Sequence, residues 1–317
     1  MRDLPDVDDL LRSTRVCALP MRTKFRGITT REVVVFEGPA GWGEFSPFVE
    51  YDDVEASSWL AAGIEAAYLG APTPVRDVVE INATVPAVPA DQVRAVLACY
   101  PGATTAKVKV AEPGQSLSDD VDRVAAAREL IPHVRIDANA KWTVPQAIEA
   151  IAAIGDVQYV EQPCATVEEL ALVRRAVSSP IAADESIRRA SDPMRVVAHD
   201  AADVAVLKVA PLGGMRAVLR LAEQMKMPIV VSSALDSAVG ISAGVATAAA
   251  LPTLDLACGL GTGALFVDDV APSFIPDGGV VLPRAVTPFE ALPLASSERA
   301  EWWRDRLRRC HGILATR

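Results

Sequence analysis

From about residue 79 the chain alternates between short runs rich in β-forming residues and longer runs with helical patterning. The β-type runs are VEINATV, AKVKVA, VRIDAN, VQYVEQP, PIAADES, VAVLKVAP, PIVVSSA and LDLACGL. Strand–helix alternation predicts a parallel sheet covered by helices, and eight such runs predict a closed (β/α)8 barrel of the TIM type. An open, doubly wound sheet is the alternative architecture, but no GxGxxG follows the first β run.

The segments on either side of the barrel have a different pattern. The N-terminal segment contains TREVVVFEG and GWGEFSP, a turn at Gly38-Pro39 and a helical run, which predict an α+β capping domain. The C-terminal segment is rich in proline and ends in SSERAEWWRDRLRRCHG, an amphipathic helix that we expect Ser297 to cap. We therefore divide the chain into a cap (1–78), a barrel (79–266) and a C-terminal segment that returns to the cap (267–317).

Composition limits the class of protein. Half of the 317 residues are hydrophobic, so a large core can form, and a net charge of −10 without basic runs argues against a nucleic-acid partner. The most apolar stretch, residues 238–251, is too short to span a bilayer and predicts a buried helix. Five scattered cysteines without a CxxC pair, and a start without a signal-peptide core, predict a cytoplasmic protein. Whether it is a monomer or a homo-oligomer stays open.

Acidic residues stand at the ends of three successive β runs. Asp137, Glu161 and Asp184 follow one another at spacings of 24 and 23 residues. Because active groups of a (β/α)8 barrel come from the C-terminal strand ends, we expect these carboxylates to form an arc at one rim. Close carboxylates repel one another unless a cation intervenes, and oxygen-only ligands favour Mg²⁺ over zinc. The alternative is that each acid is a helix cap or a solvated rim charge.

Lysines also occur where the strand pattern predicts burial. Lys107 and Lys109 share one face of the second β run, and Lys208 lies in the sixth, which is opposite in a ring of eight. An exposed edge strand would also carry lysines, but beside the carboxylates we expect all three to face the barrel mouth. A nearby cation and a metal ion lower the pKa of a lysine, so Lys109 could act as a general base on a metal-held carboxylate substrate.

The motifs KVK, DAN, VEQP, ADES and LKVAPLGG, in this order and spacing, closely resemble those of the enolase superfamily. They are most similar to its lysine–lysine branch, which includes muconate cycloisomerase, and GWGEFSP resembles the capping domain of the superfamily. The resemblance therefore covers most of the chain. It implies one Mg²⁺ bound by Asp137, Glu161 and Asp184, an acid/base pair of Lys109 and Lys208, and support from Lys107, Asn139 and Glu185.

Within this branch the compact cap most resembles the o-succinylbenzoate synthase family of the actinobacterial type. That resemblance implies dehydration of 2-succinyl-6-hydroxy-2,4-cyclohexadiene-1-carboxylate to o-succinylbenzoate in menaquinone synthesis. Lys109 would remove the α-proton and then protonate the leaving hydroxyl, while Lys208 stays protonated and stabilises the dienediolate. FRGITTRE, residues 25–32, lies where the family has a mobile loop, so we expect Phe25–Thr30 to close over the substrate. The substrate contacts implied are Arg26, Ser232, Ser233 and Gly259, with Arg26 equally interpretable as a surface arginine.

Two other functions stay open at this point. An N-succinylamino acid racemase would use the same two lysines, as would another isomerase of the lysine–lysine branch, and only the short cap disfavours the racemase. A barrel without catalysis, acting as a binding subunit, is disfavoured because all five core residues are present. Histidine-dependent chemistry is disfavoured because His133, His199 and His311 all lie away from the predicted strand ends, and the sequence contains no GxSxG or P-loop motif.

Overall fold

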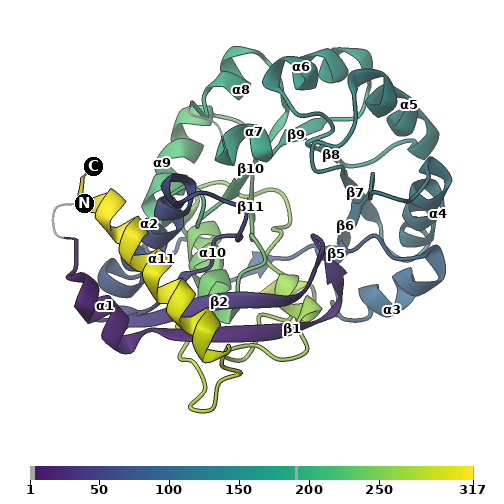
Figure 1. Cartoon of the computed structure of the whole chain (residues 1–317). Helices are drawn as coiled ribbons and strands as arrows, with labels where there is room; N and C mark the ends of the chain where they lie inside the picture. Colours follow the sequence, from purple (N-terminus) through teal and green to yellow (C-terminus); the bar gives the residue numbers. More distant parts are fainter. Residues whose placement is uncertain (1–3, 190–191, 317) are drawn as a thin grey trace.

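The computed structural model describes residues 4–189 and 192–316 (Figure 1). Its main sheet has seven parallel strands whose spatial order follows the sequence. Five of them lie within the β-type runs that the sequence predicts, and β6 and β7 begin one residue before theirs. They are β5 (Ala83–Val85), β6 (Thr105–Lys109), β7 (His133–Asp137), β8 (Val160–Glu161), β9 (Ile181–Ala183), β10 (Val204–Lys208) and β11 (Ile229–Ser232).

The eighth predicted run closes the ring through a bridge of two residues rather than a regular strand. On one side the Gly259 amide donates to the Val231 carbonyl at the end of the sheet. On the other side the Cys258 amide donates to the Glu80 carbonyl, and the Cys258 carbonyl accepts from the Asn82 amide. The run contains Gly259, and a glycine weakens a strand. The (β/α)8 barrel is thus confirmed.

Helices surround this ring (Figure 1). Several begin at a Ser or Thr that caps the free amides of the first turn, as the capping boxes at Ser116 and Thr166 show. The apolar stretch predicted as a buried helix forms α10 (Ala238–Ala250). The other helices of the barrel are η1 (Ala90–Gln92), α3 (Val93–Leu97), α4 (Leu117–Arg128), α5 (Val144–Ile154), α6 (Val167–Ala176), α7 (Glu185–Arg188), α8 (Arg195–Ala198), α9 (Met215–Met225) and η2 (Thr262–Leu265).

The cap is an antiparallel sheet with helices packed on it. Its elements are α1 (Val7–Ser13), β1 (Arg15–Phe25), β2 (Ile28–Gly38), β3 (Gly41–Phe45) and α2 (Asp53–Leu69).

The C-terminal helix α11 (Ser297–Ala315) lies along this cap (Figure 1). Trp303 is fully buried there, and its indole nitrogen donates to Glu32 at 2.8 Å. The expectation that Ser297 caps this helix is wrong by one residue, because the Ser296 hydroxyl accepts the Arg299 amide. Two short strands, β4 (Val79–Glu80) and β12 (Val280–Val281), form a separate antiparallel pair. This pair joins the segment after the barrel to the residues just before β5.

Close backbone contacts hold the cap against the barrel. A Cβ on Gly43 would lie 2.0 Å from the Gly63 carbonyl oxygen, so β3 and α2 can approach this closely only because both residues are glycine. The next residue, Glu44, accepts from the amides of Ser237 and Gly240 at the start of α10. The cap is therefore fixed to the C-terminal side of β11. Among the described residues no helix is long and apolar enough to cross a membrane.

Candidate active site

The three predicted carboxylates lie buried at the C-terminal ends of β7, β8 and β9. Asp137 is 1% exposed, and Glu161 and Asp184 are fully buried. Asp137 pairs in register with Glu161, but Glu161 pairs with Ala182, two residues before Asp184. Asp184 is therefore two residues out of register with Glu161, because neighbouring strands of a closed barrel are staggered. The Asp184 side chain still points to the same face of the sheet as the other two carboxylates, since a shift of two residues preserves the side-chain direction.

Each carboxylate contacts a lysine amine. The Lys107 amine lies 2.7 Å from Glu161 Oε1 and 3.3 Å from Asp137 Oδ2, so it bridges two strands. The Lys109 amine lies 2.5 Å from Asp137 Oδ2. The Lys208 amine lies 2.6 Å from Asp184 Oδ2. The structure therefore brings all six predicted charges together inside one end of the barrel.

Burial and mutual repulsion set the protonation of these acids. Burial raises the pKa of Glu161 to about 7, with further contributions from Asp137 and Asp184 that Lys107 opposes. Burial also opposes ionisation of the other two acids, but their cationic neighbours outweigh it. Lys109 and Lys107 lower the pKa of Asp137, while Lys208 and Arg188 lower the pKa of Asp184 to about 2. The three acids thus differ in their affinity for a proton.

The pKa of Lys109 is lowered as well. Burial is the main cause; Asp137 opposes it, and the charge of Lys107 contributes to the lowering. The sequence had suggested neighbouring cations as the cause, whereas desolvation is the larger effect. A buried amine with a lowered pKa loses its proton more readily, as a general base requires.

Asn139 and Glu185 lie next to the carboxylates and lysines and form hydrogen bonds around them. Asn139 has a left-handed backbone conformation with φ +46°. Its backbone N–H donates to Asp137 Oδ1 at 3.0 Å, and its side-chain oxygen accepts from the Lys109 amine at 2.8 Å. Its side-chain nitrogen lies 3.4 Å from Glu185 Oε1. The other oxygen of Glu185 is buried and has no hydrogen-bond partner among the described residues. Asn139 and Glu185 therefore lie where support of the site was expected.

Two residues of the site were missed by sequence reasoning. Gln162 Oε1 accepts from the amides of Asp184 and Ser186 at 3.0 and 3.1 Å and so ties the end of β8 to the end of β9. Arg188 donates to Asp184 Oδ1 at 2.9 Å and to Glu185 Oε1 at 2.7 Å. The only signals were the position of Gln162 directly after Glu161 and the i,i+4 spacing of Arg188 from Asp184.

The donor set of this site fits a hard divalent cation. It offers only oxygen atoms, from three carboxylates whose repulsion a cation would relieve. Within the described part of the chain no three His, Cys, Asp or Glu side chains stand in the arrangement of a metal-binding cluster. Each carboxylate is oriented toward a lysine instead, and the long stems of lysines allow them to move aside.

The predicted substrate residues line one small cavity together with the lysines. This cavity, of about 30 Å³, is bordered by Arg26, Ser232, Ser233 and Gly259 as well as by Lys109 and Lys208. It also includes Thr262, which shares a hydrogen bond of 2.6 Å with Ser233. A larger space of about 740 Å³ adjoins Lys109 on the solvent side. The two lysines thus border the same space from opposite strands.

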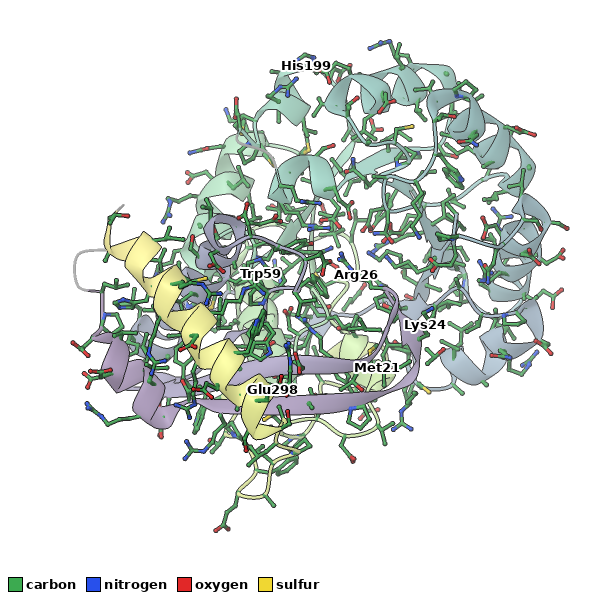
Figure 2. The ribbon with its side chains drawn as sticks, viewed as in Figure 1. Met21, Lys24, Arg26, Trp59, His199 and Glu298 are labelled. Carbon is green, nitrogen blue, oxygen red and sulfur yellow. The ribbon has the colours of Figure 1, made fainter. Side chains whose placement is uncertain are left out.

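Arg26 is exposed to solvent and also borders the small cavity. Figure 2 shows it projecting over the ring of strands. Its guanidinium lies 3.9 Å from the centre of the Phe48 ring and 3.6 Å from Glu50. The segment around it is a hairpin turn and not the loop expected from Phe25 to Thr30. Only Arg26 and Gly27, with φ +50° and +81°, lie between β1 and β2, and two positive φ values in succession are typical of tight hairpins.

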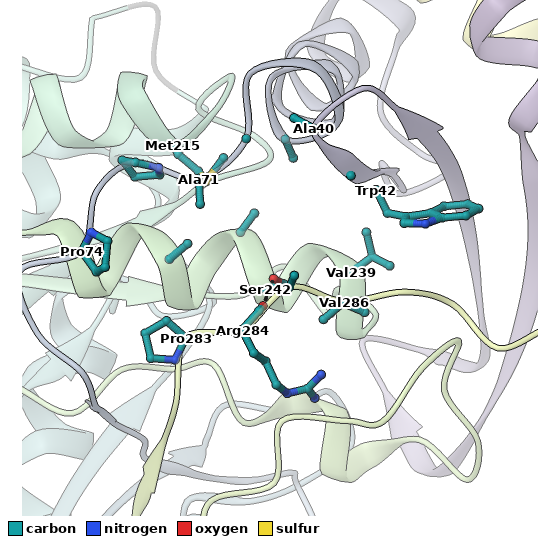
Figure 3. Close-up of a pocket in the computed structure, with 17 residues that line it drawn as sticks. Ala40, Trp42, Ala71, Pro74, Met215, Val239, Ser242, Pro283, Arg284 and Val286 are labelled. Atoms are coloured by element: carbon teal, nitrogen blue, oxygen red, sulfur yellow. Dashed lines mark hydrogen bonds between the residues drawn. The ribbon is translucent and has the colours of Figure 1, made fainter.

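A separate cavity of about 280 Å³ lies between the cap and α10 (Figure 3). Its walls are mostly apolar, with Trp42, Met215 and Val239 among them. Its one charged side chain, Arg284, stacks over Phe274 and donates to backbone carbonyl groups. None of the predicted site residues lines this cavity.

Comparison with known families agrees with this geometry. Residues 16–67 match the family described as enolase N-terminal domain-like, and residues 90–286 match the one described as enolase C-terminal domain-like. The L-Ala-D/L-Glu epimerase from Bacillus subtilis is similar in structure, with a TM-score of 0.71 and 22% identity over 89% of this chain and 98% of the epimerase. Muconate lactonizing enzyme from Pseudomonas putida gives a TM-score of 0.69 and 21% identity over 93% and 98%. The chain belongs to the enolase superfamily.

Proteins from mycobacteria are much more similar in sequence. The o-succinylbenzoate synthase of Mycolicibacterium smegmatis is 59% identical over 98% of this chain and 99% of its own length. The protein of that name from Mycobacterium tuberculosis is 59% identical over 98% and 97%, and the one from Mycobacterium leprae is 58% identical over 98% and 95%. Within the superfamily, the chain is therefore a member of the o-succinylbenzoate synthase family, which confirms the resemblance seen in its motifs.

Proposed function

We propose that this chain is a Mg²⁺-dependent o-succinylbenzoate synthase, acting in the cytoplasm on a small carboxylate in menaquinone synthesis. The observation that carries the proposal is the pair of lysines, Lys109 and Lys208, which border one cavity beside three buried carboxylates. The reaction removes water from a hydroxylated cyclohexadiene carboxylate and leaves an aromatic ring. It requires a base, an acid for the hydroxyl and a positive environment for the carboxylate.

Lys109 supplies both proton transfers. Its neutral amine takes the proton from the carbon next to the carboxylate, and the resulting ammonium gives a proton to the departing hydroxyl, which leaves as water. The lowered pKa of Lys109, caused mainly by burial, supports this role, because the amine gives up its proton more readily than an exposed lysine does. Asn139, 2.8 Å from the amine, orients it. Lys107 stays charged, since Glu161 and Asp137 raise its pKa despite its burial.

Lys208 remains protonated and faces the reacting ring from the other side. Its charge stabilises the negative charge that develops when the proton leaves. Asp137, Glu161 and Asp184 would hold one Mg²⁺, which when bound supplies a Lewis acid for the substrate carboxylate. The rest of the substrate contacts Ser232, Ser233, Gly259 and Arg26. The domain arrangement that we propose is a cap (1–78), a barrel (79–266) and a C-terminal segment (267–317).

The test uses the two lysines separately. Aromatisation changes the ultraviolet absorbance, so dehydration can be followed directly for the wild type, Lys109→Arg and Lys208→Arg, with EDTA as the metal control. Lys109→Arg should lose about 10²- to 10⁴-fold or more in rate, because a guanidinium does not deprotonate near neutral pH. Lys208→Arg keeps the charge and should retain more activity. A folded Lys109→Arg enzyme that dehydrates at the wild-type rate would show that the base is wrongly assigned.

An N-succinylamino acid racemase is the second candidate, because two lysines on opposite sides of one cavity are also what racemisation requires. Racemisation uses both amines as acid and base, so arginine at either position should abolish it. The same variants are therefore assayed with an N-succinylamino acid by polarimetry. Racemisation at a rate exceeding dehydration in the wild type would favour this second function.

A further inference from the structure

Arg188 holds one oxygen of Asp184 in a fixed position. All three guanidinium nitrogens have a partner: Nε donates to Asp184 Oδ1 at 2.9 Å, Nη2 to Glu185 Oε1 at 2.7 Å and Nη1 to the Tyr51 hydroxyl at 3.0 Å. The side chain of Arg188 is only 3% exposed. A planar group that is anchored at three points and excluded from solvent cannot turn away from the carboxylate as a lysine can.

The cap anchors this arginine through Tyr51. The Tyr51 ring packs edge-on against Phe48, with ring centres 5.6 Å apart. The backbone carbonyls of both residues accept from Arg306 of α11. The position of Arg188 is therefore determined by the cap as well as by the barrel.

The two side-chain oxygens of Asp184 accept from two different kinds of donor, and the same is true of Asp137. In each, Oδ1 accepts from a donor that is held in place: Arg188 for Asp184, and the Asn139 amide for Asp137. In each, Oδ2 accepts from a lysine amine at the end of a long stem. Only Oδ2 can become free without disturbing the backbone or a buried guanidinium. Both aspartates thus present a single oxygen to a cation.

We propose that Arg188 acts as a positioning residue that restricts Asp184 to one-oxygen ligation and so makes the site selective for Mg²⁺ against Ca²⁺. Mg²⁺ requires a near-octahedral arrangement with few carboxylate oxygens, whereas Ca²⁺ takes six to eight oxygens and is often bound by both oxygens of one carboxylate. The inference rests on the proposed metal role of Asp184. It extends that role to a residue outside the motifs.

The test measures binding of MgCl₂ and of CaCl₂ separately by calorimetry, on the whole chain after treatment with EDTA. The quantity of interest is the ratio of the two dissociation constants. In Arg188→Gln the preference for Mg²⁺ should fall by about tenfold or more, which is the scale on which loss of a group that orients a metal ligand changes metal affinity. Loss of the positive charge tightens the binding of both ions, so it leaves the ratio unchanged.

Arg189→Gln is the matched control. It removes the same charge from the next residue, whose side chain is 52% exposed, pairs with Glu55 and lies 5.2 Å from the centre of the Tyr51 ring. Its ratio should equal that of the wild type. Tyr51→Phe removes only the hydroxyl that accepts from Arg188, and should lower the ratio in the same direction by a smaller factor.

The outcomes separate this inference from the proposed function. A folded Arg188→Gln protein with the wild-type ratio would overturn the inference alone. If circular dichroism shows that Arg188→Gln does not fold, Tyr51→Phe decides, and an unchanged ratio in that variant overturns the inference. A wild-type chain that binds neither ion would overturn the proposed metal site, and the inference with it.

Discussion

Replacement of Lys107 by Met tests how the charges inside the barrel are balanced. The Lys107 amine lies between Glu161 and Asp137, and its side chain is only 7% exposed. Met keeps most of the apolar stem but leaves two buried carboxylates without this cation. Removing one partner of a buried ion pair costs about 3–5 kcal/mol of unfolding free energy, a large part of the 5–15 kcal/mol that is typical of a whole protein.

The control is a lysine with the same geometry and a different environment. The Lys141 amine lies 2.8 Å from Glu112, almost the same distance as in the buried pair, but the two side chains are 33% and 41% exposed. Exposed pairs contribute about 0–1 kcal/mol. Lys141→Met should therefore unfold near the wild-type urea concentration, although each substitution removes one lysine and, with it, an ion pair of 2.7 or 2.8 Å.

The assay is equilibrium unfolding in urea at neutral pH, in EDTA and then with excess Mg²⁺. In EDTA, Lys107→Met should be less stable than Lys141→Met by about 3 kcal/mol. Mg²⁺ binds only the folded state, and at one hundred times its dissociation constant it would restore about 2.7 kcal/mol. Equal stability of the two variants in EDTA would refute the view that burial, and not distance, sets the strength of these pairs.

Three further predictions concern the cap. Arg26→Ala should lower kcat/KM about tenfold or more but change the unfolding free energy by only about 1 kcal/mol, the scale of an exposed cation–π contact; an unchanged kcat/KM would exclude a role in substrate binding. Burial, with a contribution from Asp236, raises the pKa of Glu44 from 4.5 to about 7, so the folded state binds this proton more tightly and stability falls as the pH rises between these values. Glu44→Gln should therefore gain roughly 3 kcal/mol relative to the wild type between pH 4 and pH 8, and parallel stability curves would contradict this. Gly43→Ala should cost at least about 2 kcal/mol because its Cβ would meet a carbonyl oxygen, whereas Gly312→Ala on α11 meets no atom and should stabilise by about 0.5–1 kcal/mol, both measured by urea unfolding.

Much of the barrel was predictable because strand and helix patterns are local. Side chains alternate between the two faces of a strand, so the spacing of Lys107 and Lys109 predicts their common face without knowledge of the neighbours. The strand ends likewise identify Asp137, Glu161 and Asp184 as residues of one rim. Such inferences need only a few consecutive residues at a time.

The tertiary structure decided what depends on distant segments. Only packing of the cap on the barrel brings Tyr51 to Arg188, 137 residues further along the chain, and no periodic pattern marks that contact. The stagger of the strands, a property of the closed ring, moved Asp184 out of register with Glu161. The tight turn at Arg26 replaced an expected loop because Phe25 and Ile28 pair directly across it, beyond a register shift between Pro20 and Phe25. Local periodicity thus determines the direction of each side chain, but its partners depend on how the ring closes and where the cap packs.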